Sequence, residues 1–173
     1  MKKIYIVLTY TGTILSRIVK LYTKKEYSHV SISLDRKLNH MYSFGRLNPY
    51  IPFWGGFVRE SPDYGTFKRF KDTKSKIFSI DVEEEQYEMI KELIEDIDSN
   101  KGNYRFNVLG LVAVMANIHL DRDRCFYCAE FVKYVLDNTQ IDFGLPDVIK
   151  PDDFQKISNC DEIFTGFLRE YNM

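Results

Sequence analysis

The order of apolar and polar positions predicts that the chain opens with a strand, a helix and a second strand. Residues 4–8 are an unbroken apolar stretch rich in β-branched side chains, which is typical of a buried strand. After a turn at residues 9–12, apolar side chains at positions 14, 18 and 21 follow helical spacing. Residues 29–34 alternate instead, with apolar residues at even positions and polar ones at odd positions. This second strand therefore has a polar face, and His29 lies on it.

The second half of the chain predicts three long helices. Residues 83–97 have apolar side chains at helical spacing and three glutamates in the first turn, where the helix dipole favours negative charge. Residues 106–118 are apolar on all sides, which indicates a central buried helix. From Cys128, apolar residues recur three, four, seven and eight positions later, so Cys128 begins the buried stripe of the third helix.

Strand patterns at residues 41–44, 77–81 and 163–168 complete an α+β chain. Between the first two of these lies a stretch rich in glycine and proline, residues 45–74, which we expect to be a loop-rich insertion with short strand pieces such as residues 57–59. With 173 residues, 45% of them hydrophobic, and no repeat or linker, the chain predicts one domain with a sizeable core.

Charge and cysteine content limit the partners and the compartment. The formal net charge is −1, so no overall basic field attracts nucleic acid or anionic lipid. The longest apolar run is shorter than the roughly 20 residues that a bilayer requires, so we expect no stable membrane insertion. Three cysteines, two of them three positions apart, make a poor disulfide framework, and residues 4–8 are shorter than a signal-peptide core. We therefore expect a cytoplasmic protein.

Two residues have the chemistry of a nucleophile and its base. Cys128 stands at the start of a predicted helix, where free N–H groups and the helix dipole favour a thiolate. His29, on the polar face of its strand, could accept the thiol proton. The two residues are 99 positions apart, so the sequence alone does not show that they meet. A small core cysteine and an isolated histidine are the structural alternatives.

The spacing of the cysteines raises a different chemistry. Cys125 and Cys128 form a C-x-x-C pair, which could be a redox pair or half of a zinc site completed by His119 and Cys160. No second C-x-x-C and no H-x-x-x-H motif accompanies it. We therefore expect neither a metal site nor a cofactor.

Two segments together resemble a known superfamily. Residues 27–34 (YSHVSISL) and 125–132 (CFYCAEFV) look like the paired signatures of the circularly permuted NlpC-type papain-like proteins, which include YiiX-like and lecithin retinol acyltransferase-like members. In that group the histidine strand precedes the cysteine helix, which is the order found here. The family's nucleophile falls on Cys128 rather than Cys125, because only Cys128 is followed by Ala-Glu-Phe-Val. The resemblance covers most of the chain except residues 45–74.

The resemblance implies a permuted papain-like fold, with an antiparallel sheet packed against a helix that carries the cysteine at its N-terminus. The family's third polar residue, which orients the imidazole, matches Ser43; His40 and Glu60 are the alternatives, because serine is short and uncharged. Tyr10 and Thr11 match the region that often lines the oxyanion pocket.

The activity implied is that of a thiol hydrolase or acyltransferase, similar to an amidase or peptidase. Cys128 would attack an amide or ester carbonyl of a small molecule, peptide or lipid and form a thioester, with His29 as acid and base. Residues 45–74 would form one wall of the cleft, with Trp54 as a substrate-binding residue. The alternatives are a catalytically silent ligand-binding domain of the same fold, using the aromatic loop at residues 50–57, and a thiol redox protein using Cys125 and Cys128.

Overall fold

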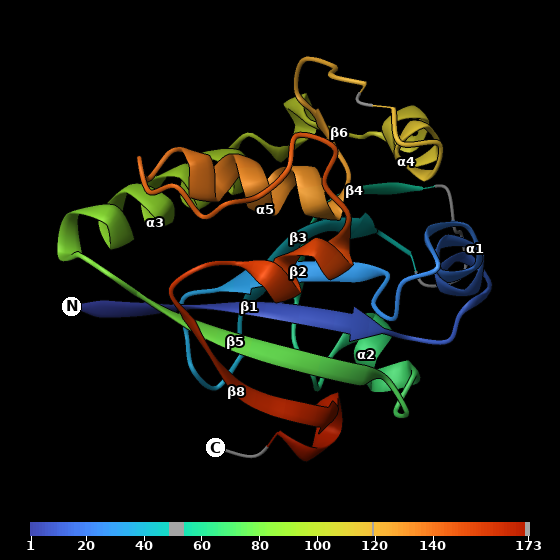
Figure 1. The fold of residues 1–173 in the computed structure, drawn as a ribbon, viewed down its shortest axis with the longest axis horizontal. Helices are drawn as coiled ribbons and strands as arrows, with labels where there is room; N and C mark the ends of the chain where they lie inside the picture. The colour runs from blue at the N-terminus through green and yellow to red at the C-terminus, as the bar shows by residue number, and fades with distance from the viewer. Residues whose placement is uncertain (49–53, 119, 172–173) are drawn as a thin grey trace.

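A six-stranded antiparallel sheet forms the centre of the protein (Figure 1). The computed structural model describes residues 1–48, 54–118 and 120–171. Neighbouring strands of the sheet follow the order β4-β3-β2-β1-β5-β8. The strands are β1 (Lys2–Tyr10), β2 (His29–Ser33), β3 (Met41–Arg46), β4 (Gly55–Glu60), β5 (Lys74–Val82) and β8 (Cys160–Phe167). Two further short strands, β6 (Arg105–Phe106) and β7 (Cys125–Phe126), pair in parallel. The chain is therefore of the α+β class, as the sequence predicts.

Helices flank this sheet on both faces and at one end (Figure 1). They are α1 (Ile14–Thr23), α2 (Gly65–Arg69), α3 (Glu84–Ser99), α4 (Val108–Met115) and α5 (Cys128–Asp137), with 3₁₀ turns at Lys101–Asn103, Pro151–Lys156 and Leu168–Glu170. α3 and α5 lie along the same face of the sheet, whereas α1 and α4 lie at the end where β1 finishes. Among the described residues, none of these helices combines the length and the apolar character needed to cross a bilayer.

Strand β1 is buried on both of its faces, which explains its unbroken apolar stretch. Ile4, Ile6 and Leu8 point into the larger core, between the sheet and helices α3 and α5. Tyr5 and Val7 point into a smaller core on the opposite face, which includes side chains from β3, α2 and β5. Because both faces are covered, the strand has no polar positions to alternate with.

The long helices α3 and α5 confirm the sequence prediction. In α3, Ile90, Ile94 and Ile97 are almost fully buried, and the side chain of Gln86 accepts a hydrogen bond from the backbone of the N-cap residue Glu83 at 2.9 Å. In α5, the buried stripe runs from Cys128 through Phe131, Val132, Val135 and Leu136. This stripe packs α5 against β2 and β3.

Residues 45–74, expected to be a loop-rich insertion with short strand pieces, contain more regular structure than that expectation. The full length of β4 pairs with β3, from Met41 opposite Glu60 to Arg46 opposite Gly55, and α2 follows it. A Cβ atom at Gly55 would lie 2.8 Å from both the Gly45 carbonyl oxygen and Phe106, so this glycine permits close packing within a strand rather than a turn. Residues 49–53 lie outside the described residues.

The expectation of a central buried helix over residues 106–118 is wrong. α4 is a short peripheral helix, and the side chains of Leu109 and Val112 are 58% and 55% exposed. In α1, the apolar residues at positions 14, 18 and 21 likewise face outward. The buried residues of this helix are Ser16 and Val19. Apolar composition marks a helix but does not specify which of its faces the fold covers.

Candidate active site

Cys128 is the first residue of α5, and its thiol faces the interior at 5% exposure. Glu130, in the first turn, accepts a hydrogen bond from the backbone N–H of the N-cap residue Tyr127 at 3.0 Å and another from the side-chain amide of Asn107 at 3.1 Å. These bonds fix the start of the helix. The first N–H groups of a helix have no intrahelical partner, so the position of Cys128 offers donors to a developing negative charge.

His29 is the first residue of β2, and its imidazole is held by a carboxylate from the sheet edge. Its Nε2 lies 3.0 Å from Oε2 of Glu60, the last residue of β4. The hydroxyl of Ser31 donates to the same oxygen at 2.6 Å. The side chains of His29 and Glu60 are only 20% and 14% exposed, so water competes little for this pair. With Nε2 engaged by Glu60, Nδ1 is the ring nitrogen left for another partner.

Cys128 also interacts with this imidazole, and the three groups together set the charge on the ring. Burial by itself lowers the pKa of His29, but the negative charge of Glu60 and hydrogen bonds with Cys128 and Glu60 outweigh it and raise this pKa to about 10. Burial raises the pKa of Glu60, and the imidazolium charge, with hydrogen bonds from His29 and Ser31, lowers it below its ordinary value. At neutral pH the pair is therefore an imidazolium and a carboxylate. The structure therefore places a charged imidazole beside a thiol at a helix N-terminus, which is the combination of groups that a cysteine nucleophile uses.

His29, Glu60 and Cys128 all line one cleft with an empty volume of about 620 Å³, including its open mouth. Leu15 and Val19 of α1 form part of its wall. Aromatic and apolar residues from the sheet, α2, β6 and α4 make up much of the remainder, namely Phe44, Phe67, Phe106 and Leu111. Such a cleft is suited to a ligand with an apolar portion.

Ser43, the first choice for the third polar residue, does not contact the imidazole. It is fully buried in β3, and its hydroxyl donates to the backbone carbonyl of Val30 at 2.7 Å. His40 lies in the exposed turn beyond the far end of β2. Glu60, the remaining alternative, is the residue that meets His29. The sequence reading favoured Ser43 because it stands on the strand after the histidine strand, whereas the carboxylate comes from one strand further along the sheet.

The predicted binding residues have different positions. Thr11 lines the cleft, but Tyr10 is not among its lining residues, and the ammonium group of Lys20 lies 4.6 Å from the Tyr10 ring centre. Trp54 is 59% exposed and also lies outside the lining. Residues 45–74 form part of the cleft wall, as expected, but through residues such as Arg46, Thr66 and Phe67 and not through Trp54.

Arg46 is a cleft residue that the sequence reading missed. It ends β3, and it lines both this cleft and an adjoining hollow between β4 and α2. The pKa of the Arg46 guanidinium is lowered, because burial and the nearby charge of Arg69 together outweigh the opposing charge of Glu60. Its charge in turn helps to hold Glu60 ionised. A charged residue at the end of a β-strand shows in the sequence, but its place beside Glu60 depends on the pairing of β3 with β4.

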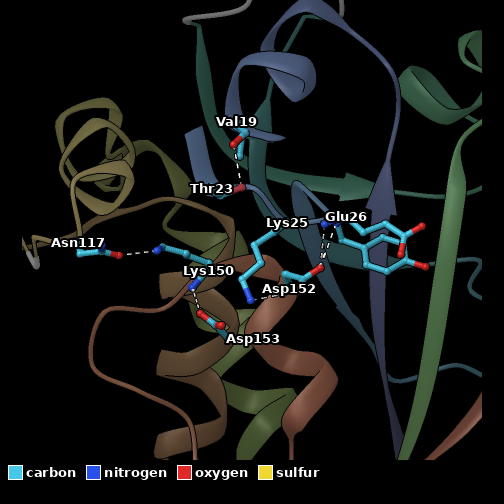
Figure 2. A network of polar contacts seen from close by, with 9 residues as sticks. Val19, Thr23, Lys25, Glu26, Asn117, Lys150, Asp152 and Asp153 are labelled. Carbon is cyan, nitrogen blue, oxygen red and sulfur yellow. Dashed lines mark hydrogen bonds and ion pairs between the residues drawn. The ribbon is translucent and has the colours of Figure 1, made fainter. Parts of the chain in front are cut away.

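Residues 149–152 contact the residues just before His29 and just before Cys128, and Figure 2 shows the part of this arrangement around Asp152. Asp152 Oδ1 accepts hydrogen bonds from the backbone N–H groups of Glu26 and Tyr27, each at 3.2 Å. The hydroxyl of Tyr127, the residue before Cys128, donates to the Ile149 carbonyl at 2.8 Å. Residues 149–152 therefore fix the approach to β2 and to α5 at once. No local motif signals this role, because Asp152 is 125 residues from Tyr27.

The other cysteines lie away from the cleft. All three thiols are free. Cys125, in β7, lines a separate hollow with Phe126 and Tyr134, so the two members of the C-x-x-C pair face different spaces. The Cys160 thiol donates to the Ile157 carbonyl at 3.2 Å. His119 lies outside the described residues, and within those described no three metal-binding side chains gather.

The cleft thus joins a thiol at a helix start, a charged imidazole and a carboxylate that holds it. Such a set can activate a nucleophile and deliver a proton to a leaving group. Comparison with known proteins adds nothing to this geometry: no protein-family model matches the sequence, and no curated protein matches it.

Proposed function

We propose that this protein is a thiol hydrolase or acyltransferase in which Cys128 is the nucleophile, His29 the general acid and base, and Glu60 the residue that orients and charges the imidazole. The observation that carries the proposal is the convergence in one cleft of Cys128, at the N-terminus of α5, and His29, hydrogen-bonded to Glu60. The permuted papain-like fold suggested by the sequence resemblance forms part of this proposal.

In the first half of the reaction the Cys128 thiolate attacks the carbonyl carbon of an ester or amide. The carbonyl π electrons move to oxygen, and the N–H groups at the start of α5 stabilise the resulting oxyanion. When the tetrahedral intermediate collapses, the bond to the leaving oxygen or nitrogen breaks and His29 donates its proton to that atom. An alcohol or amine departs, and a thioester remains on Cys128.

In the second half His29 is neutral and acts as the base. It takes a proton from water, or from an acceptor alcohol or amine, as the oxygen or nitrogen attacks the thioester carbonyl. Collapse of this intermediate breaks the C–S bond, regenerates the thiolate and releases the acid or the transferred acyl product. The negative charge of Glu60 stabilises the imidazolium at the start and at the end of the cycle.

The substrate class follows from the cleft. Its apolar wall favours an acyl or leaving group with a hydrophobic portion, and Arg46 offers a positive charge near the reacting atoms. A small molecule, peptide or lipid with an amide or ester carbonyl fits this description. We place the activity in the cytoplasm, because three unpaired thiols are typical of a reducing compartment.

Acyl-enzyme trapping tests the proposal. The protein is mixed with p-nitrophenyl butyrate, and the site of acylation is located by peptide mass spectrometry. We expect a butyryl thioester on Cys128, release of nitrophenol in repeated turnovers, and loss of both in Cys128→Ala. Cys125→Ala is the matched control and should behave as the unmodified protein does. Acylation of Cys125 in preference to Cys128, or turnover that persists in Cys128→Ala, would exclude this mechanism.

A second measurement separates an enzyme from a silent binding domain. In His29→Asn the thioester, if formed at all, should accumulate without turnover, because no base remains to activate water. If the unmodified protein binds ester analogues in the cleft, but its Cys128 neither acylates nor reacts with iodoacetamide faster than Cys125 does, the site is a ligand pocket and the catalytic proposal fails.

A further inference from the structure

Helices α1 and α4 expose an apolar surface that the fold leaves uncovered. Its members are the outward side chains of Ile14, Ile18, Leu21, Tyr22, Leu109 and Val112, which we call the α1–α4 surface. Ile14 and Leu21 are 80% and 73% exposed. The two helices contact each other and lie together at one end of the molecule (Figure 1). Single exposed hydrophobic residues are ordinary, but a group of large ones on two adjacent helices indicates a binding surface.

The inner faces of the same helices account for their attachment to the body. Leu15 and Val19 of α1 and Leu111 of α4 line the cleft. α1 is therefore apolar on two sides, and only the inner side serves the packing of this chain. The outer residues at positions 14, 18 and 21 follow helical spacing, so they form a continuous stripe rather than scattered contacts.

The segments that contain the two helices carry basic but no acidic side chains. Residues 11–25 contain four basic side chains and no acidic one, and residues 104–120 contain a single arginine and no acidic side chain. This local excess stands out in a chain whose net charge is −1. Lys25 is paired with Asp152 at 3.7 Å, which leaves Arg17, Lys20 and Lys24 as the cations beside the stripe. Arg17 and Lys24 are exposed.

Apolar side chains flanked by lysine and arginine on a helix are the pattern of a helix that lies in a membrane interface. We propose that the α1–α4 surface binds peripherally to a membrane with anionic headgroups, the apolar stripe entering the interface and the basic residues meeting the lipid phosphates and carboxylates. A second copy of this chain is a poorer occupant. A two-fold dimer through α1 would bring Arg17, Lys20 and Lys24 toward their own symmetry mates, which places like charges together.

The ends of both helices are fixed to one segment of the body, which makes the surface a single unit. Lys150 donates to the side chain of Asn117, just after α4, at 2.5 Å, and Asp152 binds Lys25 and the backbone just after α1 (Figure 2). Because the inner faces of α1 and α4 line the cleft, membrane contact would bring the open cleft close to the lipid surface. The proposal concerns binding and does not depend on the catalytic one.

Sedimentation with vesicles tests this surface, using Cys128→Ala so that no reaction intervenes. We expect binding to phosphatidylcholine vesicles that contain phosphatidylserine, and at least about tenfold weaker binding to phosphatidylcholine alone. Replacing Arg17 and Lys24 by Gln should weaken binding about 30-fold, if each basic residue contributes as it usually does at an anionic surface. Ile14→Ser with Leu21→Ser should weaken it at least as much. Both pairs are exposed, so circular dichroism should show an unchanged fold.

Matched controls lie on the other side of the sheet. Lys68 and Lys71 are exposed lysines at α2, and Tyr64 is a 72% exposed aromatic residue next to it. Lys68→Gln with Lys71→Gln, and Tyr64→Ser, should leave vesicle binding within about twofold. The proposal would be overturned if binding to both vesicle types were equal, or if the control variants lost as much binding as the α1–α4 variants. It would also be overturned if no vesicle binding occurred and analytical ultracentrifugation showed a dimer that Leu21→Ser dissociates. The last result would identify the surface as a contact between copies.

Discussion

Replacing Glu60 by Gln removes one negative charge from the cleft while keeping the size of the side chain. Glu60 Oε2 accepts hydrogen bonds from His29 at 3.0 Å and from Ser31 at 2.6 Å. After the change, burial still lowers the pKa of His29 and Cys128 still raises it, but the charge of Glu60, the largest influence that raises it, is gone. We expect the pKa of His29 to fall from about 10 toward its ordinary value of 6.5.

The size of the effect follows from proton linkage. A histidine whose pKa is raised in the folded state stabilises that state fully below the unfolded pKa, and this stability is lost as the pH rises toward the folded value. With pKa values of 6.5 unfolded and about 10 folded, the His29 contribution to the free energy of unfolding falls by about 3 kcal/mol between pH 6 and pH 9. In Glu60→Gln the folded pKa lies closer to the unfolded one, so the His29 contribution to the free energy of unfolding changes much less over the same interval.

Urea denaturation at pH 6 and pH 9 measures this difference. Other groups titrate in the same interval. The quantity to compare is therefore the change in the free energy of unfolding between pH 6 and pH 9 in the unmodified protein, minus the same change in Glu60→Gln. Glu84→Gln, which removes an exposed carboxylate that pairs with Lys2, is the matched control. We expect the difference only for Glu60. Parallel pH profiles for the unmodified protein and Glu60→Gln would show that Glu60 does not hold the imidazolium, and would refute the reasoning.

Three further substitutions test other parts of the structure. Asp152→Ala leaves two backbone N–H groups without their acceptor, so it should lower the free energy of unfolding by about 1–3 kcal/mol and slow iodoacetamide labelling of Cys128. Lys25→Ala should lower the free energy of unfolding by less than about 1 kcal/mol. Ser43→Ala should cost about 1 kcal/mol without changing the labelling rate, because its hydroxyl bonds to the backbone; slower labelling at constant stability would restore Ser43 as the third polar residue. Phe131→Ala, in the core, should cost about 3–5 kcal/mol in urea denaturation and Leu109→Ala less than about 1 kcal/mol, and similar costs would contradict the peripheral position of α4.

The local pattern of the sequence determined most of the elements. The apolar run of β1, the helical spacing in α3 and the stripe that begins at Cys128 each depend on neighbours a few residues away, and each is found where the sequence predicts it. The position of Cys128 at a helix start follows from the same local information, because the apolar stripe begins there. His29 was placed at the start of a strand for the same reason.

Tertiary structure decided which faces are covered and which side chains meet. Helical spacing could not tell that α4 is peripheral, because burial depends on what the rest of the chain places against each face. The partner of His29 is Glu60 rather than Ser43 because strand pairing brings the end of β4 beside the imidazole, and no spacing along the chain encodes that pairing. The hydrogen bond that Asp152 accepts from the backbone of Tyr27, just before His29, likewise joins residues 125 positions apart. Local patterns fix conformation, whereas a site built from distant segments is fixed by the packing that joins them.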